Sequence, residues 1–156
     1  MEIRLAGPQD ATALCEVVRR SITELCIADH KNDPEILSRW LENKTPENVI
    51  QWLANPDATI LVAIELDAVL AAGCVTRAGE IVLNYVSPDA RFRGVSRALL
   101  HALEETAQRN GNSVCRLDST MTALRFYGGA GYVQAGEPIR KFGLEGYPMM
   151  KPLPPA

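Results

Sequence analysis

The stretch Ile81–Leu100 constrains the fold most, because it joins a strand, a basic turn and the start of a helix. Its first residues, Ile81–Val86, are rich in apolar and β-branched side chains, which predicts a strand. Ser87-Pro88 ends that strand, since proline has no backbone N–H to donate to a neighbouring strand. A helix is then expected from Val95. Its first N–H groups have no intrahelical partner and its dipole is positive there, so this junction is predicted to bind an anion.

The turn before this helix carries side chains that suit a phosphate. Arg91, Arg93 and Arg97 offer positive charge and planar donors, and Gly94 lets the backbone approach a ligand closely. The turn lacks the Gly-Lys-Ser/Thr of a P-loop and the three glycines of the dinucleotide fingerprint. The turn alone therefore leaves two interpretations open: a phosphate site of another kind, or a solvated basic start of a helix.

Two motifs in the right order favour the phosphate site. The Arg-x-x-Gly-x-Ser of Arg91–Ser96 resembles the pyrophosphate loop of the GNAT N-acetyltransferase superfamily, Gln/Arg-x-x-Gly-x-Gly/Ala, with Ser96 as the last small residue. The stretch Thr120–Tyr132 resembles that family's later motif, Asn-x-x-Ala-x-x-Phe-Tyr-x-x-x-Gly-Phe/Tyr. In it Thr120 replaces the Asn, and the matching positions are Ala123, Phe126, Tyr127, Gly131 and Tyr132. The resemblance covers essentially the whole chain.

The resemblance implies an α/β (α+β) fold, with a mixed, mostly antiparallel sheet of about six or seven strands and helices on both faces. It implies one domain over residues 1–153 and a tail over residues 154–156. It also implies acetyl-CoA as co-substrate. The residues expected at the cofactor are Tyr85, Val86, Arg91, Arg93, Gly94, Val95, Ser96, Arg97, Thr120, Ala123, Phe126 and Tyr127.

The pattern of the remaining chain fits this fold. Pro8, Pro34 and Pro46 suit first helical turns, and the last two follow the N-cap residues Asp33 and Thr45. Trp40 and Trp52 in these short helices are expected in the core. The predicted strands are 2–6, 59–65, 69–76, 80–86, 114–119, 132–135 and about 147–153, and the predicted helices after residue 90 are 95–110 and 121–130. In the first of those helices, Val95, Leu99, Leu103 and Ala107 are expected inward and Glu104 outward.

Composition excludes several other classes of protein. The net charge of −3 argues against a general nucleic-acid binder, and the apolar runs are too short to cross a membrane. The N-terminus has no apolar run typical of a signal peptide, and the four cysteines show no Cys-x-x-Cys spacing. We therefore expect a cytoplasmic protein with buried, reduced cysteines. With only two histidines, no metal site is suggested. The sequence leaves a homodimer open.

By resemblance, acetyl transfer needs a donor to the thioester carbonyl, a base for the amine and an acid for the leaving thiolate. The family's backbone donor corresponds to Tyr85-Val86, at a bulge of the strand. Tyr127 is the candidate acid, because a phenol with a pKa near ~10 is protonated at neutral pH. The alternative is that Tyr127 only packs on its helix and hydrogen-bonds the cofactor. Glu80 is the first candidate base; Asp118, His30 and a water chain stay open, although His30 is expected to be an ordinary surface histidine.

These inferences predict an enzyme that moves an acetyl group from acetyl-CoA to a primary amine of a small molecule or peptide. No cysteine falls where a covalent acyl carrier is needed, so direct transfer in a ternary complex is expected. One alternative is a non-catalytic acyl-CoA-binding or sensor protein on the same fold. Another is a nucleotide-binding α/β protein of a different family, which ATP or NAD would stabilise and CoA would not.

Overall fold

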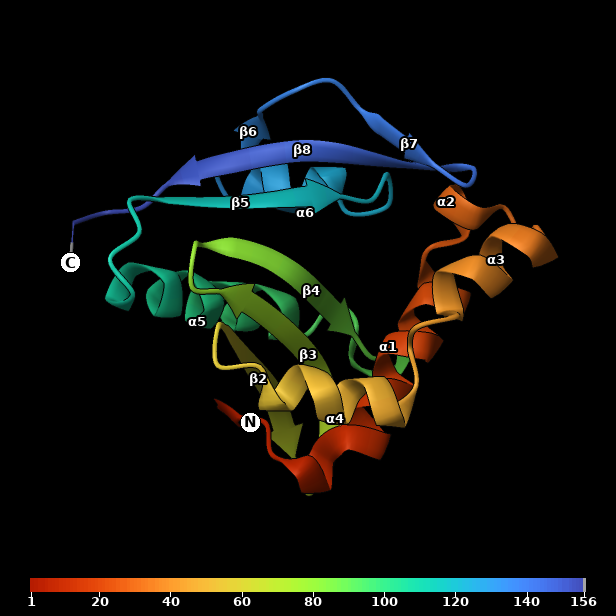
Figure 1. Ribbon diagram of the computed structural model, residues 1–156, viewed down its shortest axis with the longest axis horizontal. Coiled ribbons are helices and arrows are strands. Elements are labelled where there is room, and N and C mark those ends of the chain that lie inside the picture. The colour runs from red at the N-terminus through yellow and green to blue at the C-terminus, as the bar shows by residue number, and fades with distance from the viewer. Residues whose placement is uncertain (156) are drawn as a thin grey trace.

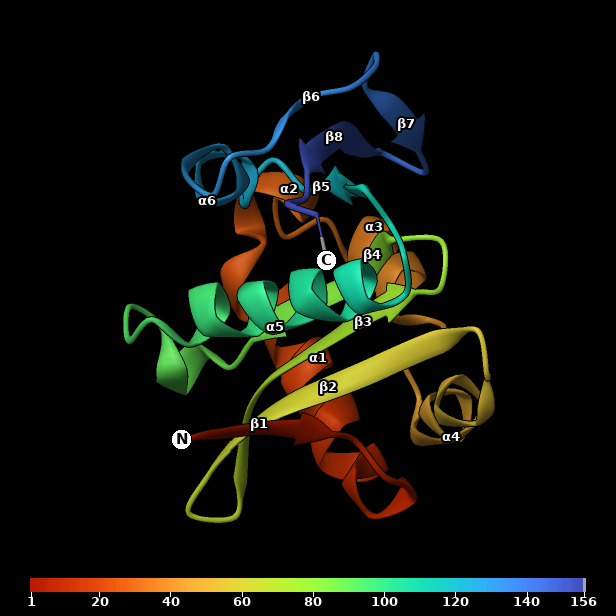
Figure 2. The same ribbon diagram turned by 90° about the vertical axis from the view of Figure 1, so that its left-hand side faces the viewer.

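The computed structural model describes residues 1–155 as one mixed sheet with helices on both faces (Figures 1 and 2). The helices are α1 (Ala11–Leu25), α2 (Ile27–His30), α3 (Pro34–Leu41), α4 (Pro46–Ala54), α5 (Val95–Arg109) and α6 (Leu124–Gly129). The strands are β1 (Glu2–Leu5), β2 (Ala58–Glu65), β3 (Ala68–Thr76), β4 (Glu80–Val86), β5 (Val114–Ser119), β6 (Val133–Gln134), β7 (Ile139–Lys141) and β8 (Leu144–Pro152). The predicted fold class is confirmed.

The sheet has the order β1-β2-β3-β4-β5-β8-β6, and β7 pairs with β8. All neighbouring strands are antiparallel except β4 and β5, which are parallel and joined through α5 as predicted. A parallel pair needs such a crossover, because a tight turn can only reverse the chain. The predicted hairpin of β2 and β3 is also present, with Leu66 and Asp67 at positive φ in its turn.

Two apolar layers cover the sheet because side chains of β2 and β3 alternate between its faces. Ile60 and Val62 pack with α1, α3 and α4, whereas Leu61 and Ala63 pack with α5. Figure 2 shows α5 crossing in front of these strands and α1 behind them. All four cysteines are buried, and both tryptophans pack in the layer formed by α1, as predicted.

Caps visible in the sequence set the starts of the short helices. The Asp33 carboxylate accepts hydrogen bonds from the backbone N–H groups of Glu35 and Ile36 at the start of α3. The Thr45 hydroxyl accepts one from Asn48 N at the start of α4. Each side chain satisfies N–H groups that have no partner within the helix. Both helices therefore begin at the prolines that the sequence indicates.

The structure differs from the predicted elements near the C-terminus. Helix α6 begins at Leu124, three residues later than expected, because Thr120–Ala123 forms a separate turn. Strand β8 begins at Leu144 and pairs with β7, a strand that the sequence did not predict. In the expected tail, the carbonyls of Pro154 and Pro155 accept hydrogen bonds from Gln108, and residue 156 lies outside the described residues.

The prediction that Glu104 points outward is wrong. Its side chain is buried between α5 and the C-terminal strands. There the carboxylate accepts a hydrogen bond of 2.7 Å from the Tyr132 hydroxyl and pairs with Lys151 Nζ at 3.1 Å. These partners offset the cost of burying a charge, and the helical periodicity of α5 gives no sign of them.

No helix within residues 1–155 combines the length and the apolar composition that a membrane span requires.

Candidate active site

A cleft opens where β4 and β5 separate. The two strands pair only at Glu80–Arg116 and Ile81–Leu117, after which β4 turns away from β5 toward its arrowhead in Figure 1. A cavity of about 400 Å³ fills the opening and is lined by Ile81–Val86 along one side. Beyond Ile81, the backbone donors and acceptors on this edge of β4 therefore do not pair with any strand within residues 1–155.

The bulge in β4 lies at Val82. The pairing of β4 with β3 shifts between Leu83–Cys74 and Ile81–Val75, which leaves Val82 as the extra residue. Tyr85 and Val86, where the sequence analysis placed the bulge, pair regularly with Ala72 and Ala71. That placement is wrong, since strand sequence carries no signal for the position of a bulge. The unpaired edge is nevertheless where it was expected, and it includes Tyr85 and Val86.

The turn before α5 presents backbone N–H groups at one end of the cleft. Phe92 and Gly94 have φ values of +62° and +77°, so the chain curls with left-handed residues that turn successive N–H groups inward. Within residues 1–155 no side chain caps α5, so the N–H groups of its first turn have no side-chain partner there. Val95 and Ser96 line the cleft beside them. This concave, uncapped start of a helix suits an anion.

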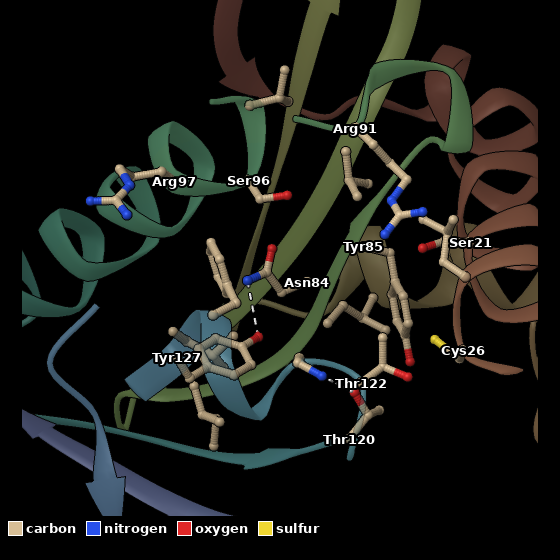
Figure 3. Close-up of a pocket in the computed structure, with 18 of the residues that line it drawn as sticks. Ser21, Cys26, Asn84, Tyr85, Arg91, Ser96, Arg97, Thr120, Thr122 and Tyr127 are labelled. Atoms are coloured by element: carbon tan, nitrogen blue, oxygen red, sulfur yellow. Dashed lines mark hydrogen bonds between the residues drawn. The ribbon is translucent and has the colours of Figure 1, made fainter. Parts of the chain in front are cut away.

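The three arginines of this region have different surroundings. Arg91 lines the cleft, and its guanidinium lies 4.5 Å from the centre of the Phe92 ring. In Figure 3 it extends toward Ser21 and Tyr85, whereas Arg97 lies on α5 at the opposite side of the view. Arg93 is not among the lining residues, because its guanidinium forms an ion pair of 2.6 Å with Glu65 at the end of β2.

Tyr127 lies on the other wall of the cleft with its hydroxyl proton uncommitted. The hydroxyl oxygen accepts a hydrogen bond of 3.0 Å from Asn84 Nδ2 on β4 (Figure 3), and no residue described in the structure accepts its proton. Burial raises the pKa of Tyr127 to about 12, and the Asn84 hydrogen bond opposes this shift. Edge-to-face contacts with Phe126 and Tyr132 hold the ring. The group is thus a fixed, neutral donor at neutral pH.

Another part of the cleft is formed by the C-terminal end of α1, by Cys26 and by the turn after β5. Cys26, Tyr85 and Thr122 meet there, as Figure 3 shows. Burial raises the pKa of the Cys26 thiol to about 12, and the nearby charge of Asp29 adds to the shift. A thiol with this pKa carries almost no thiolate at neutral pH and is a poor nucleophile.

The candidate bases are not equally placed. His30 is fully buried: its Nε2 donates to the Ile22 carbonyl at 3.0 Å, and its Nδ1 accepts from Asn32 N. The surface position expected for it is wrong, and both ring nitrogens are occupied. Glu80 lies outside the cleft, in a neighbouring hollow with Arg116. Asp118 lines both the cleft and that hollow.

The comparisons with known proteins decide the family. The family model described as "Acetyltransferase (GNAT) domain" matches residues 27–153. The chain belongs to the GNAT acetyltransferase family. A search of curated proteins found no match.

Solved GNAT structures share this fold. A GCN5-related N-acetyltransferase from Rhodopseudomonas palustris superposes with a TM-score of 0.86 at 24% identity, over 97% of this chain and 95% of that one. PaiA N-acetyltransferase from Thermoplasma acidophilum, in complex with coenzyme A, superposes with a TM-score of 0.82 at 20% identity, over 97% of this chain and 98% of that one. The yncA protein from Salmonella typhimurium, with its cofactor acetyl-CoA, superposes with a TM-score of 0.75 at 21% identity, over 100% of this chain and 95% of that one.

Most residues that the sequence analysis placed at the cofactor or in catalysis lie around this one cleft. Those that line it are Tyr85, Val86, Arg91, Gly94, Val95, Ser96, Arg97, Thr120, Ala123, Phe126 and Tyr127. Arg93 and Glu80 are the two exceptions. Sequence reasoning missed Asn84, Cys26 and Asp29, of which the last binds the turn after β5. Asn84 had a weak signal, as a polar residue inside an apolar strand beside two predicted site residues.

Proposed function

We propose that this GNAT protein transfers the acetyl group of acetyl-CoA to a primary amine of a small molecule or peptide, directly within a ternary complex. The amine nitrogen forms a bond to the thioester carbon, and the carbon–sulfur bond breaks. One amine proton goes to a base, and CoA leaves as a thiolate that accepts a hydrogen bond or a proton. The protein supplies orientation, donors and a route for that proton.

One observation carries the proposal: the unpaired edge of β4 runs between an uncapped helix start and a tyrosine with a free hydroxyl proton. The N–H groups around Gly94 and Ser96 suit the pyrophosphate. The edge of β4 can hydrogen-bond the amides of the pantetheine arm as another strand would. An N–H group of the same edge can meet the thioester oxygen as it gains charge. Tyr127 then lies on the side of the departing sulfur.

A carboxylate or a water chain is the proposed route for the amine proton. Asp118 lines the cleft directly, and no cation within residues 1–155 forms an ion pair with it. Glu80 lies in the neighbouring hollow and would act through water, because the two openings share Val82 and Asp118. His30 has no ring nitrogen free to accept a proton.

Two measurements test this proposal and separate it from its alternatives. A thermal-shift screen compares acetyl-CoA, longer acyl-CoAs, ATP and NAD. Ligand at about a hundred times its Kd should stabilise the fold by ~2.7 kcal/mol. Release of CoA is then followed with a panel of small-molecule and peptide amines. Binding of acetyl-CoA without turnover on any amine would favour a non-catalytic acyl-CoA-binding protein. Stabilisation by ATP or NAD, and not by any acyl-CoA, would contradict both the acetyltransferase and the acyl-CoA-binding protein.

Arg91→Ala should weaken acetyl-CoA binding more than Arg93→Ala does. Arg91 lines the cleft, so its removal should cost a charged hydrogen bond to a phosphate, ~1.5–3 kcal/mol. The Arg93 guanidinium is engaged by Glu65 at 2.6 Å, and its loss should leave affinity within about threefold. Calorimetric titration of both variants measures the difference. If Arg91→Ala weakens the binding of acetyl-CoA and of acetyl-pantetheine, which lacks the pyrophosphate, by the same factor, the substitution has damaged the loop instead.

Cys26→Ala should keep turnover within about threefold of the wild type, although the residue lines the cleft. Its buried thiol has a pKa of about 12, so it is not expected to carry the acetyl group. Mass spectrometry of the wild-type protein after incubation with acetyl-CoA alone should show no acetylated Cys26. An acetyl adduct there, together with loss of turnover in the variant, would overturn direct transfer.

A further inference from the structure

The turn that follows β5 has no partner in β4. After Ile81 and Leu117, β4 and β5 share no paired residues, and the pairing of β5 with β8 ends at Ser119, just before the turn Thr120–Ala123. This turn leads into α6, which has only six residues. So short a helix is not stable by itself and takes its position from contacts with the rest of the protein. Yet α6 carries Tyr127.

Asp29 makes one such contact, in addition to the packing of α6 against the core. It lies on α2, and its carboxylate accepts hydrogen bonds from Met121 N at 2.7 Å and Thr122 N at 3.2 Å. It also accepts one from the Thr122 hydroxyl. Thr122 is drawn beside Cys26 and Thr120 at this end of the cleft (Figure 3). A single side chain thus joins two segments that lie more than ninety residues apart.

The charge of Asp29 is buried and has no counter-ion among the described residues. The residue is 8% exposed, and the ion pairs within residues 1–155 do not include it. Among the residues that the structure describes, the three donors of the turn are the groups that offset the cost of its burial. The neighbouring His30 fixes α2 in turn, through its hydrogen bonds to Ile22 and Asn32. Both partners of the contact are therefore held firmly.

The turn is connected to Tyr127 by a series of hydrogen bonds. Thr120 closes the turn, because its hydroxyl accepts from Ala123 N at 3.2 Å. The Ala123 carbonyl accepts the hydrogen bond of Tyr127 N at 3.0 Å. The Tyr127 hydroxyl then meets Asn84 on β4. Asp29 fixes one end of this chain of contacts and Asn84 fixes the other.

We propose that Asp29 is a positioning residue: by binding the turn Met121–Thr122 beside the cleft, it holds Tyr127 in the geometry needed for acetyl transfer. The inference rests on the proposed function, since Tyr127 acts on the thioester only if the protein is an acetyltransferase. Asp29 itself does not touch the reacting atoms. Its effect on the reaction must therefore disappear when the Tyr127 hydroxyl is absent.

The test is a double-mutant cycle of Asp29→Ala and Tyr127→Phe. Asp29→Ala alone should lower kcat by roughly 10- to 10²-fold, the size expected for a displacement of about 1 Å, with a smaller change in the KM of the amine. In the Tyr127→Phe background it should lower kcat by less than about twofold, because coupled residues are not additive. A full additional loss in that background, or an unchanged kcat in folded Asp29→Ala, would overturn the proposal.

Asp33→Ala is the matched control. Asp33 is a carboxylate of the same segment that also binds two backbone N–H groups, but these belong to α3, which it caps, and not to the turn after β5. It should lower the melting temperature and keep kcat. If Asp29→Ala does not fold, Asp29→Asn replaces it; the amide keeps the shape and one acceptor, so a smaller loss of kcat in the same cycle is expected.

Hydrogen exchange gives a readout that does not depend on activity. The amides of Met121, Thr122 and Tyr127 should exchange faster in Asp29→Ala than in the wild type and stay unchanged in Asp33→Ala. Unchanged exchange at these amides would contradict the positioning role. Faster exchange in a protein that transfers acetyl to no amine would instead refute the proposed function and, with it, the catalytic part of this inference.

Discussion

Gly94→Glu is expected to abolish acetyl-CoA binding while the fold survives. A Cβ built at Gly94 meets no atom within 4 Å, so the cost to folding is the left-handed backbone at φ +77°, about 1–2 kcal/mol. The new carboxylate lies beside N–H groups of α5 that have no side-chain cap, where it repels the pyrophosphate and competes for its donors. Losing two charged hydrogen bonds, at ~1.5–3 kcal/mol each, should weaken affinity by at least ~10²-fold.

Gly94→Ala is the control for this substitution. It carries the same backbone cost without the charge, so acetyl-CoA affinity should fall by less than about tenfold. Calorimetric titration with acetyl-CoA measures both variants, and circular dichroism with thermal melting shows whether they are folded. A folded Gly94→Glu protein that binds acetyl-CoA with wild-type affinity would mean that the cofactor site lies elsewhere.

Local signals in the sequence predicted most of the fold. Proline after Asp33 or Thr45 marks a helix start, because cap and first turn are set within four residues. The parallel pairing of β4 and β5 followed from a helix between two strands. The basic turn was predictable for the same reason, since Arg91, Gly94 and Ser96 belong to one loop. The role expected of Tyr127 came from the family resemblance, because the spacing of residues in the sequence could not indicate it.

The features that the sequence did not predict depend on contacts between distant segments. Glu104 was expected outward because helical periodicity cannot reveal Tyr132 and Lys151, which contact it from the C-terminal part of the chain. His30 was expected on the surface because its partners are backbone groups, which a sequence does not specify. The hydrogen bond from Thr122 N to Asp29 was not predicted for the same reason, because it joins two segments that are distant in the sequence.

Arg93 illustrates the limit within a single loop. Arg91 and Arg93 are equivalent by residue type and differ by two positions, so the sequence could not choose between them as phosphate ligands. Glu65 makes the difference, because it ends β2 next to the turn and engages Arg93 at 2.6 Å. Which arginine is free for a ligand is therefore decided by a neighbouring strand. This is why the two alanine variants are expected to differ.

Tyr127→Phe is expected to lower turnover by about 10²-fold and to leave acetyl-CoA affinity almost unchanged. This is the lower end of the ~10²–10⁴ range for acid–base assistance. With a pKa raised to about 12, the Tyr127 phenol is a weaker acid than an alkyl thiol, ~8.5 for cysteine, so its proton stays largely on oxygen. The hydroxyl then assists by donating a hydrogen bond to the departing thiolate, ~1.5–3 kcal/mol. Stopped-flow measurement of CoA release with a reactive amine tests this.

The pH profile and a second tyrosine complete the test. A group with a pKa of about 12 stays protonated through neutral pH, so any step in kcat below about pH 10 must belong to another group and persist in Tyr127→Phe. Tyr132→Phe is the control: its hydroxyl donates to Glu104, away from the cleft, so its loss should lower the melting temperature and keep kcat. If Tyr127→Phe turns over at the wild-type rate while chemistry limits the reaction, solvent protonates the thiolate and Tyr127 only binds.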